Sequence, residues 1–134
     1  MGEAFDDGTS STWRGFYVYA PRTRRHAMRL ELAFVAGVVT GGGTDDIGRF
    51  SIRGGYDPEG VRVWWHKHYL GGHGVWYDGV RDGARSRVVY GGWSIAGDAS
   101  GGFRIWRGSE AADAEVLDAA VAEFAEEHAG AKVR

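Results

Sequence analysis

Residues 27–34 read Ala27-Met28-Arg29-Leu30-Glu31-Leu32-Ala33-Phe34, and large apolar side chains occupy every second position. Successive side chains of a β-strand point to opposite faces. One face of this segment is therefore apolar, while the other carries Arg29 and Glu31. This alternation predicts a half-buried strand with its apolar face on a core.

The same unit recurs along most of the chain. Between Thr12 and Arg107, short alternating runs are separated by seven breaks rich in Gly, Pro or Asp. The pattern predicts about eight antiparallel strands in an up-and-down order, closed into an all-β barrel. We therefore expect one domain, with a flexible N-terminus over 1–11 and the barrel over 12–108.

The break after Tyr69 tests the register of two strands. A two-residue loop, Gly71-Gly72, would place the Asp78 carboxylate on the core face opposite Trp65. A three-residue loop that starts at Leu70 instead pairs Trp65 with Tyr77, and it keeps both strands in phase. We prefer the longer loop, because a one-residue slip exchanges the two faces of a strand.

This parity assigns inner and outer positions for the other strands. The predicted inward residues are Trp13, Gly15, Tyr17, Tyr19, Phe50, Ile52, Val61, Val63, Trp65, Lys67, Tyr69, Val89, Gly91, Trp93, Ile95, Phe103 and Ile105. The outward positions include four large aromatic residues, Trp64, Trp76, Tyr90 and Trp106.

From Ser109 the pattern becomes helical. Ser109 is a suitable N-cap, and Gly130 is a natural end. The positions Leu117, Val121, Phe124 and His128 form one apolar stripe. We expect a C-terminal α-helix over 109–130, packed outside the barrel on the outward aromatic residues. Those residues are alternatively the interface of a homodimer.

Composition limits the classes of function. The chain has no cysteine, so it has neither a disulfide nor a thiolate site. Residues 1–108 carry a net charge of +3 and residues 109–134 carry −5, which is too little positive charge for nucleic-acid binding. No signal peptide or apolar run of membrane-spanning length is present. We expect a cytoplasmic protein without nucleic-acid or membrane partners.

The beginning and end of the predicted barrel resemble the calycins, which include lipocalins, fatty-acid-binding proteins and avidins. Ser11-Thr12-Trp13 is similar to their Gly-x-Trp opening, although the Gly is missing. Phe103-Arg104-Ile105-Trp106-Arg107 resembles the lipocalin ending, in which an Arg of the last strand packs over the Trp of the first and a helix follows. The resemblance implies that Arg107 packs on Trp13.

The middle of the chain looks more like avidin and streptavidin. Gly55-Tyr56-Asp57, the segment Val63–Tyr69, His73 and Gly92-Trp93-Ser94 follow the order of their Gly-x-Tyr-Asp, Val-x-Trp-x-x-x-Tyr, His and Trp elements. The resemblance implies that Trp65 and Trp93 are aromatic walls of a ligand site. The polar residues that hold biotin are replaced here by Gly15, Tyr19 and Gly74, so the likeness favours the architecture and argues against biotin.

Lys67 is the most informative candidate, because parity places its ammonium group inside the barrel. An ammonium in an apolar interior requires an anion, an open mouth or a lowered pKa. It either clamps an acidic ligand, acts as an activated amine, or reaches water from the end of its strand. Asp45 and Asp46, in a predicted loop, are turn residues that can also pair with Lys67 or share an acid/base role.

The histidines and basic loop residues give no stronger site. His66 and His68 have a chelating spacing, but His73 is predicted on the opposite face, which leaves only two ligands. We therefore expect neither a metal nor another cofactor. Arg22, Arg24 and Arg25 form a basic first loop, which either steers anions or is simply solvated.

Three functions follow from this barrel. The favoured one is non-catalytic binding of a small apolar or aromatic ligand, with an acidic group as an option. The expected ligand-binding residues are Trp13, Tyr17, Trp65, Lys67, Tyr69, His73, Tyr77 and Trp93. The alternatives are an isomerase, cyclase or hydratase that uses Lys67, His73 and Tyr69, and a structural or interaction module with a solid aromatic core.

Overall fold

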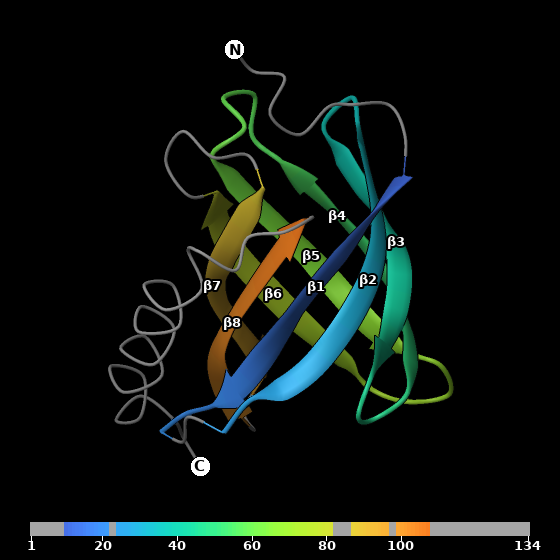
Figure 1. Cartoon of the computed structure of the whole chain (residues 1–134), viewed down its shortest axis with the longest axis vertical. Helices are drawn as coiled ribbons and strands as arrows, with labels where there is room; N and C mark the ends of the chain where they lie inside the picture. Colours follow the sequence, from blue (N-terminus) through green and yellow to red (C-terminus); the bar gives the residue numbers. More distant parts are fainter. Residues whose placement is uncertain (1–9, 22–23, 82–86, 97–98, 108–134) are drawn as a thin grey trace.

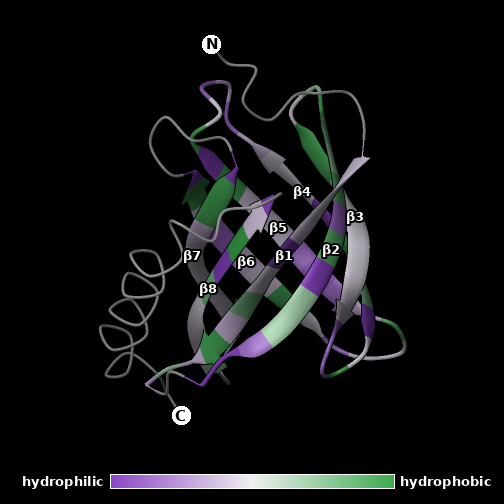
Figure 2. Ribbon diagram, viewed as in Figure 1, coloured by the Kyte–Doolittle hydropathy of each residue, from purple (hydrophilic) through white to green (hydrophobic). Residues whose placement is uncertain are grey.

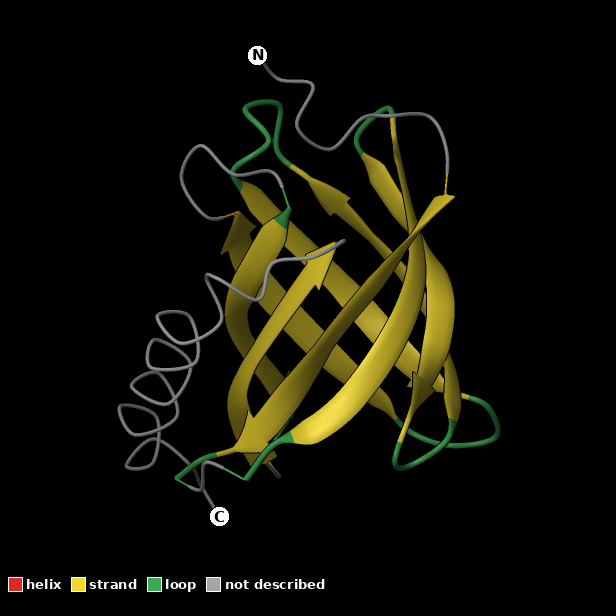
Figure 3. Ribbon diagram, viewed as in Figure 1, coloured by secondary structure: helices red, strands yellow, loops and turns green. Residues whose placement is uncertain are grey.

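The computed structural model describes residues 10–21, 24–81, 87–96 and 99–107. These residues form eight strands (Figures 1 and 3). The strands are β1 (Ser10–Tyr19), β2 (His26–Val35), β3 (Val38–Asp45), β4 (Arg49–Tyr56), β5 (Arg62–Tyr69), β6 (Gly74–Arg81), β7 (Val88–Ile95) and β8 (Ala99–Arg107). Of the predicted N-terminal segment 1–11, residues 1–9 lie outside the described residues and residues 10–11 belong to β1; the predicted helix over 109–130 also lies outside the described residues. The described residues contain no helix that is long and apolar enough to cross a membrane.

Each strand pairs antiparallel with the next, and β8 pairs back onto β1. The predicted closed meander is therefore confirmed. At the closing seam, Trp13 lies opposite Arg107 and Tyr19 lies opposite Gly101. The Arg107 guanidinium lies 5.6 Å from the centre of the Trp13 ring, as the resemblance to the lipocalin ending implies.

The alternation of side chains generates one interior core. Along β2, Met28, Leu30, Leu32 and Phe34 are buried, while Arg29 and Glu31 between them are exposed; Figure 2 shows hydrophilic and hydrophobic residues succeeding one another along this strand. At roughly 25 cal/mol per Å² of apolar surface removed from water, this core provides the main stabilisation of the barrel.

The three-residue loop after Tyr69 is confirmed. Trp65 pairs with Tyr77 and Lys67 pairs with Val75, as the longer loop requires. The Tyr69 amide also donates to the His73 carbonyl, at 3.0 Å. The odd-numbered residues of β5 and β6 therefore share the interior.

One predicted inward residue is wrong. Val61 is 44 % exposed, and β5 begins one residue later, at Arg62. The cause is the preceding turn, in which the Gly60 amide donates to the Asp57 carbonyl at 2.9 Å. The Asp57 carboxylate then accepts the Val61 amide at 2.8 Å, so Val61 still belongs to the turn.

Glycine is required where two strands approach closely on the inner face. A Cβ atom on Gly54 would lie 1.9 Å from the Trp64 carbonyl oxygen and 2.7 Å from Trp65 Cβ. No side chain fits at these distances. Gly54 therefore permits the contact between β4 and β5 beside the large Trp65 ring.

Candidate functional site

The buried side chains of Lys67 and Asp45 lie at the end of the barrel where β3 turns into β4 and β5 turns into β6. Residues 46–48, which follow Asp45 at the end of β3, form the first of these turns, and residues 70–73 form the second. We call this end the mouth. The opposite end is filled by apolar and aromatic contacts such as Trp13 against Phe34, whose ring centres are 5.8 Å apart.

Lys67 and Asp45 form an ion pair inside the mouth. Lys67 Nζ lies 2.5 Å from Asp45 Oδ2, and neither side chain has exposed surface. The interpretation that Lys67 reaches water is therefore wrong, and the expected pairing of Lys67 with a carboxylate of this loop is confirmed. The Asp45 carboxylate neutralises the Lys67 ammonium, which would be very costly to bury without an anion.

The Asp45 carboxylate has partners on both oxygens. Oδ2 also accepts the Tyr69 hydroxyl at 2.5 Å. Oδ1 accepts the backbone amides of Ile47 at 2.9 Å and Gly48 at 3.2 Å. Asp45 thus caps the turn with one oxygen and holds two buried side chains with the other, which fixes the loop over the barrel end.

Aromatic rings surround the Lys67 ammonium. Its nitrogen lies 4.3 Å from the centre of the Phe50 ring, and three tyrosine rings lie within 5.3 Å: Tyr17, Tyr69 and Tyr77. Lys67 Nζ also donates to the Tyr77 hydroxyl at 3.3 Å and approaches Met28 Sδ at 3.7 Å. The three ammonium protons therefore have acceptors from the chain itself. Cation–π attraction adds to the ion pair.

A second group lies at the rim of the mouth. The Tyr17 hydroxyl donates to Asp46 Oδ1 at 2.6 Å, and His26 Nδ1 lies 2.7 Å from Asp46 Oδ2. The Tyr17 and His26 rings are stacked, with centres 4.8 Å apart. Asp46 is about half exposed, unlike its buried neighbour Asp45.

Burial at this end favours the neutral forms of the tyrosines and of Lys67. It raises the pKa of Tyr17, Tyr69 and Tyr77, and the negative charges of Asp45 and Asp46 raise it further at Tyr17. Burial also lowers the pKa of Lys67, against the opposing effect of Asp45. For Asp46, the hydrogen bonds from Tyr17 and His26 outweigh burial and lower the pKa. The tyrosines therefore remain neutral donors at pH 7.

A small pocket opens above these groups. It is lined by Tyr17, Tyr19, Ile47, Tyr69, His73, Val75, Tyr77, Trp93 and Ile95, and its volume is about 10 Å³. That volume accommodates about one water molecule. We call it the mouth pocket. A larger ligand enters only if a side chain such as that of Ile47, which is 51 % exposed, moves aside.

The predicted ligand-binding residues divide into three sets. Five of them line the mouth pocket: Tyr17, Tyr69, His73, Tyr77 and Trp93. Lys67 lies in the buried ion pair. Trp13 and Trp65 are 1 % exposed within the core and are not among the pocket residues, because Trp65 stacks on Tyr77 and Trp13 packs on Phe34.

Sequence reasoning missed part of this site. His26 was not singled out, although it lies at the start of β2 beside Tyr17. Tyr19 was assigned inward but not to the site, and its ring lies 5.0 Å from that of Trp93. The Asp45-Asp46 pair was the one usable signal. Which partner each aspartate selects depends on contacts between strands far apart in sequence.

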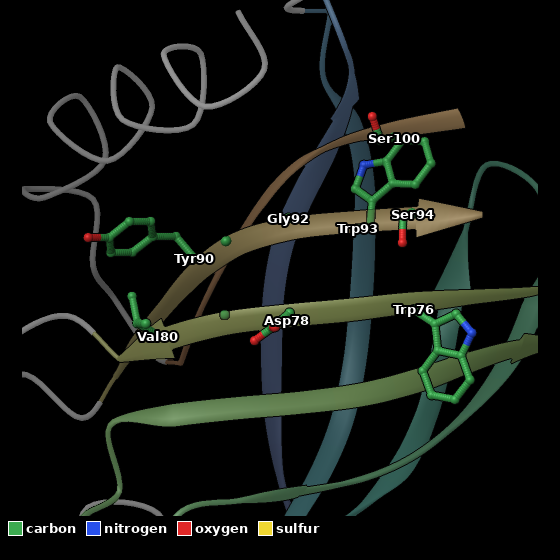
Figure 4. A pocket seen from close by; sticks show the side chains of 10 residues that line it. Trp76, Asp78, Val80, Tyr90, Gly92, Trp93, Ser94 and Ser100 are labelled. Atoms are coloured by element: carbon green, nitrogen blue, oxygen red, sulfur yellow. The ribbon is translucent and has the colours of Figure 1, made fainter. Parts of the chain in front are cut away.

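A larger hollow lies on the outer surface, away from the ion pair. It spans β6, β7 and β8, has a volume of about 660 Å³, and is lined by residues that include Trp76, Asp78, Tyr90, Gly92, Ser94 and Ser100 (Figure 4). We call it the outer groove. Asp78 is bound by Arg62 through two contacts of 3.0 and 3.1 Å. Among its lining residues, both Trp76 and Asp78 are exposed, so the groove is an open surface feature.

His66 and His73 lie in different parts of the barrel. His66 and Trp76 are cross-strand partners on the outside, with ring centres 4.4 Å apart. His73 instead lies against Tyr69 at the mouth, 5.1 Å between ring centres. Within the described ranges, no group of three or more histidine or acidic residues is arranged to hold a metal ion.

Comparisons with models of protein families, with curated proteins and with solved structures find no match for this chain.

Proposed function

We propose that this protein is a small-ligand-binding β-barrel, and that the ligand binds at the mouth pocket. The observation that carries the proposal is the buried Lys67–Asp45 pair, which is hydrogen-bonded to Tyr69 and Tyr77 of the pocket wall. A buried ion pair adds little net stability compared with apolar residues of similar volume. Perturbed ionisable groups that converge on a concave site are typical of functional sites.

The lining of the pocket indicates the class of ligand. Tyrosine, histidine and tryptophan rings form most of the wall, and they suit a flat aromatic molecule. The charge of Lys67 is already neutralised by Asp45, and Asp46 adds negative charge at the rim. We therefore propose an uncharged aromatic ligand with a hydrogen-bonding substituent, in place of the acidic ligand that an unpaired lysine would suit.

The likeness to calycins supports this proposal at the level of architecture. An up-and-down barrel of eight antiparallel strands, with Arg107 on Trp13 at its closed end, is the scaffold on which such proteins bind ligands. The calycin-like assignment is itself part of the proposal.

The test is an NMR titration of the ¹⁵N-labelled protein with benzyl alcohol, benzoate and benzylamine, which differ in charge on one ring. We expect benzyl alcohol to shift the amide signals of Tyr19, Ile47 and Ile95, which line the mouth pocket and not the outer groove, more than the two charged compounds do. A Tyr19→Ala variant should lose these shifts, whereas the outer-groove variant Trp76→Ala should keep them. Shifts confined to Trp76 and its neighbours would overturn the location.

A second candidate function is favoured by the small volume of the pocket. A barrel filled by its own side chains is a structural or interaction module. The outcome that selects it is the absence of amide shifts at the mouth with all three compounds and with a wider set of uncharged aromatic fragments.

A further inference from the structure

We propose that the C-terminal segment of this chain, residues 109–134, docks on the outer face of β1, β7 and β8. This face carries a second apolar cluster outside the barrel, formed by Phe16, Val18 and Ala20 with Tyr90 and Trp106 packed against them. We call it the outer cluster. It is separate from the mouth, so the inference does not depend on the proposed ligand.

The burial of the outer cluster requires a cover. Val18 points outward, and its neighbour across the seam is Gly102, which itself pairs with Gly92. Neither glycine has a side chain to shield Val18, yet Val18 is only 2 % exposed. Ala20, on the same face, is 5 % exposed, and so is Phe16, whose ring also lies under the guanidinium groups of Arg25 and Arg104. An outward strand position of this kind is exposed unless another element lies over it.

The position and length of the remaining chain fit this face. β8 ends at Arg107, next to Trp106 of the outer cluster, and 27 residues follow. A helix over 109–130 would be about 33 Å long at 1.5 Å per residue. The ten residues of β1 span about the same length. The helix can therefore lie along the strand without a long linker.

The charges are complementary. The segment carries seven acidic and two basic residues, whereas the sequences of β1, β7 and β8 contain no Asp or Glu. Arg14 and Arg104 point outward from this face, since they pair with Trp106 and Phe16 across the seam. The Arg104 guanidinium lies 3.9 Å from the centre of the Trp106 ring and is 2 % exposed.

From the sequence alone, more than one surface of the barrel was available for docking of the C-terminal segment. Four outward aromatic residues were equally available to the helix, and two of them, Trp64 and Trp76, are 39 % and 58 % exposed on β5 and β6. Tyr90 and Trp106 instead belong to the outer cluster. The structure therefore favours the β1, β7 and β8 face, whereas Trp76, on the β6 side of the outer groove, is exposed.

The test uses spin labels on the full-length chain, which contains no native cysteine. Arg14→Cys places a nitroxide on an exposed outward site beside Trp106, and Ser51→Cys places one on an exposed outward site of β4. Both sites are exposed, so neither label disturbs the core. We expect the label at position 14 to broaden the amide signals of Leu117, Val121 and Phe124, and the label at position 51 to leave them sharp.

A mixture of labelled unenriched protein with unlabelled ¹⁵N-enriched protein separates two occupants of the face. No broadening in the mixture, together with broadening within one molecule, supports docking of the chain on itself. Broadening in the mixture would show that the segment of a second copy covers the face, which overturns the proposal. Sharp segment signals with the label at position 14 would overturn it as well.

Discussion

Lys67 Nζ and Asp45 Oδ2 lie 2.5 Å apart at the mouth of the barrel, and both side chains are shielded from water. A lysine on β5 is thereby joined to the turn after β3, across the interior. The aspartate also holds Tyr69 and two turn amides. This pair connects the core of the barrel to the loop that borders the mouth pocket.

Breaking the pair should be costly. Asp45→Ala leaves a buried ammonium without its anion, and we expect it to lower the free energy of unfolding by about 3–5 kcal/mol. The double variant Asp45→Ala, Lys67→Met should recover part of that loss, because no unpaired charge remains. Urea unfolding of the three proteins measures both values. Asp78→Ala, at the exposed pair with Arg62, is the control and should cost about 1 kcal/mol or less.

Equal losses for Asp45→Ala and Asp78→Ala would contradict the burial of the Lys67 pair.

Alkaline pH should destabilise the protein through its buried tyrosines. The pKa values of Tyr17, Tyr69 and Tyr77 are raised in the folded state, whereas an unfolded tyrosine ionises near pH 10. At a pH between the unfolded and the folded pKa values, the unfolded state binds fewer protons than the folded state. The contribution of these tyrosines to the free energy of unfolding is therefore fully present below about pH 10 and falls as the pH rises further. The lowered pKa of Lys67 acts in the opposite direction, but it is one group against three.

Tyrosinate absorbance and near-UV circular dichroism, followed together, test this expectation. These three of the six tyrosines should ionise only as the fold is lost. Ionisation of all six with ordinary pKa values in a still-native protein would contradict it.

Acidic pH should destabilise the protein through protonation of the Asp46 carboxylate. Its pKa is lowered in the folded state by the hydrogen bonds from Tyr17 and His26, which prevail over burial. A carboxyl with a lowered folded pKa contributes stability above its unfolded value of about 3.9, and this is lost as pH falls through the folded pKa. Asp46→Asn should therefore be less stable than the native chain at pH 6, and the difference should shrink towards pH 2.

Thermal unfolding of the two proteins across this range measures the effect. A stability difference that does not change with pH would show that Asp46 does not titrate in contact with Tyr17 and His26.

A single methyl group at Gly54 should disturb the barrel. The added Cβ would collide with the Trp64 carbonyl and with Trp65, and we expect Gly54→Ala to cost about 1–3 kcal/mol or more, as overpacking does. Gly72→Ala is the matched control, because its nearest neighbour would be Tyr69 Cβ at 3.4 Å, an ordinary contact. It should change stability by less than about 0.5 kcal/mol.

Chemical denaturation compares the two variants directly. A larger loss for Gly72→Ala than for Gly54→Ala would contradict the close approach of β4 and β5.

Local pattern was sufficient to determine the architecture. The alternation through Leu30 and Leu32 identifies the buried face of β2, and the same parity, together with the turn chemistry of Asp57 and the loop at Leu70, predicts the strands and the pairing of Trp65 with Tyr77. Strand periodicity and turn preference are properties of neighbouring residues, so the sequence alone contains them. The inward position predicted for Val61 is wrong because a hydrogen bond from its amide to the Asp57 carboxylate extends the turn by one residue.

The partners of the ionisable residues were decided only by the closed barrel. Asp45 and Asp46 are adjacent in sequence, yet one is buried against Lys67 and Tyr69 while the other binds Tyr17 and His26 at the rim. The shear and closure of eight strands bring β1, β3 and β5 together at one end, and no local pattern encodes which side chains then meet. The sequence determined which residues point inward. The three-dimensional arrangement determined which charged side chains pair, because a buried charge has no contact with water and must be neutralised by another group of the protein.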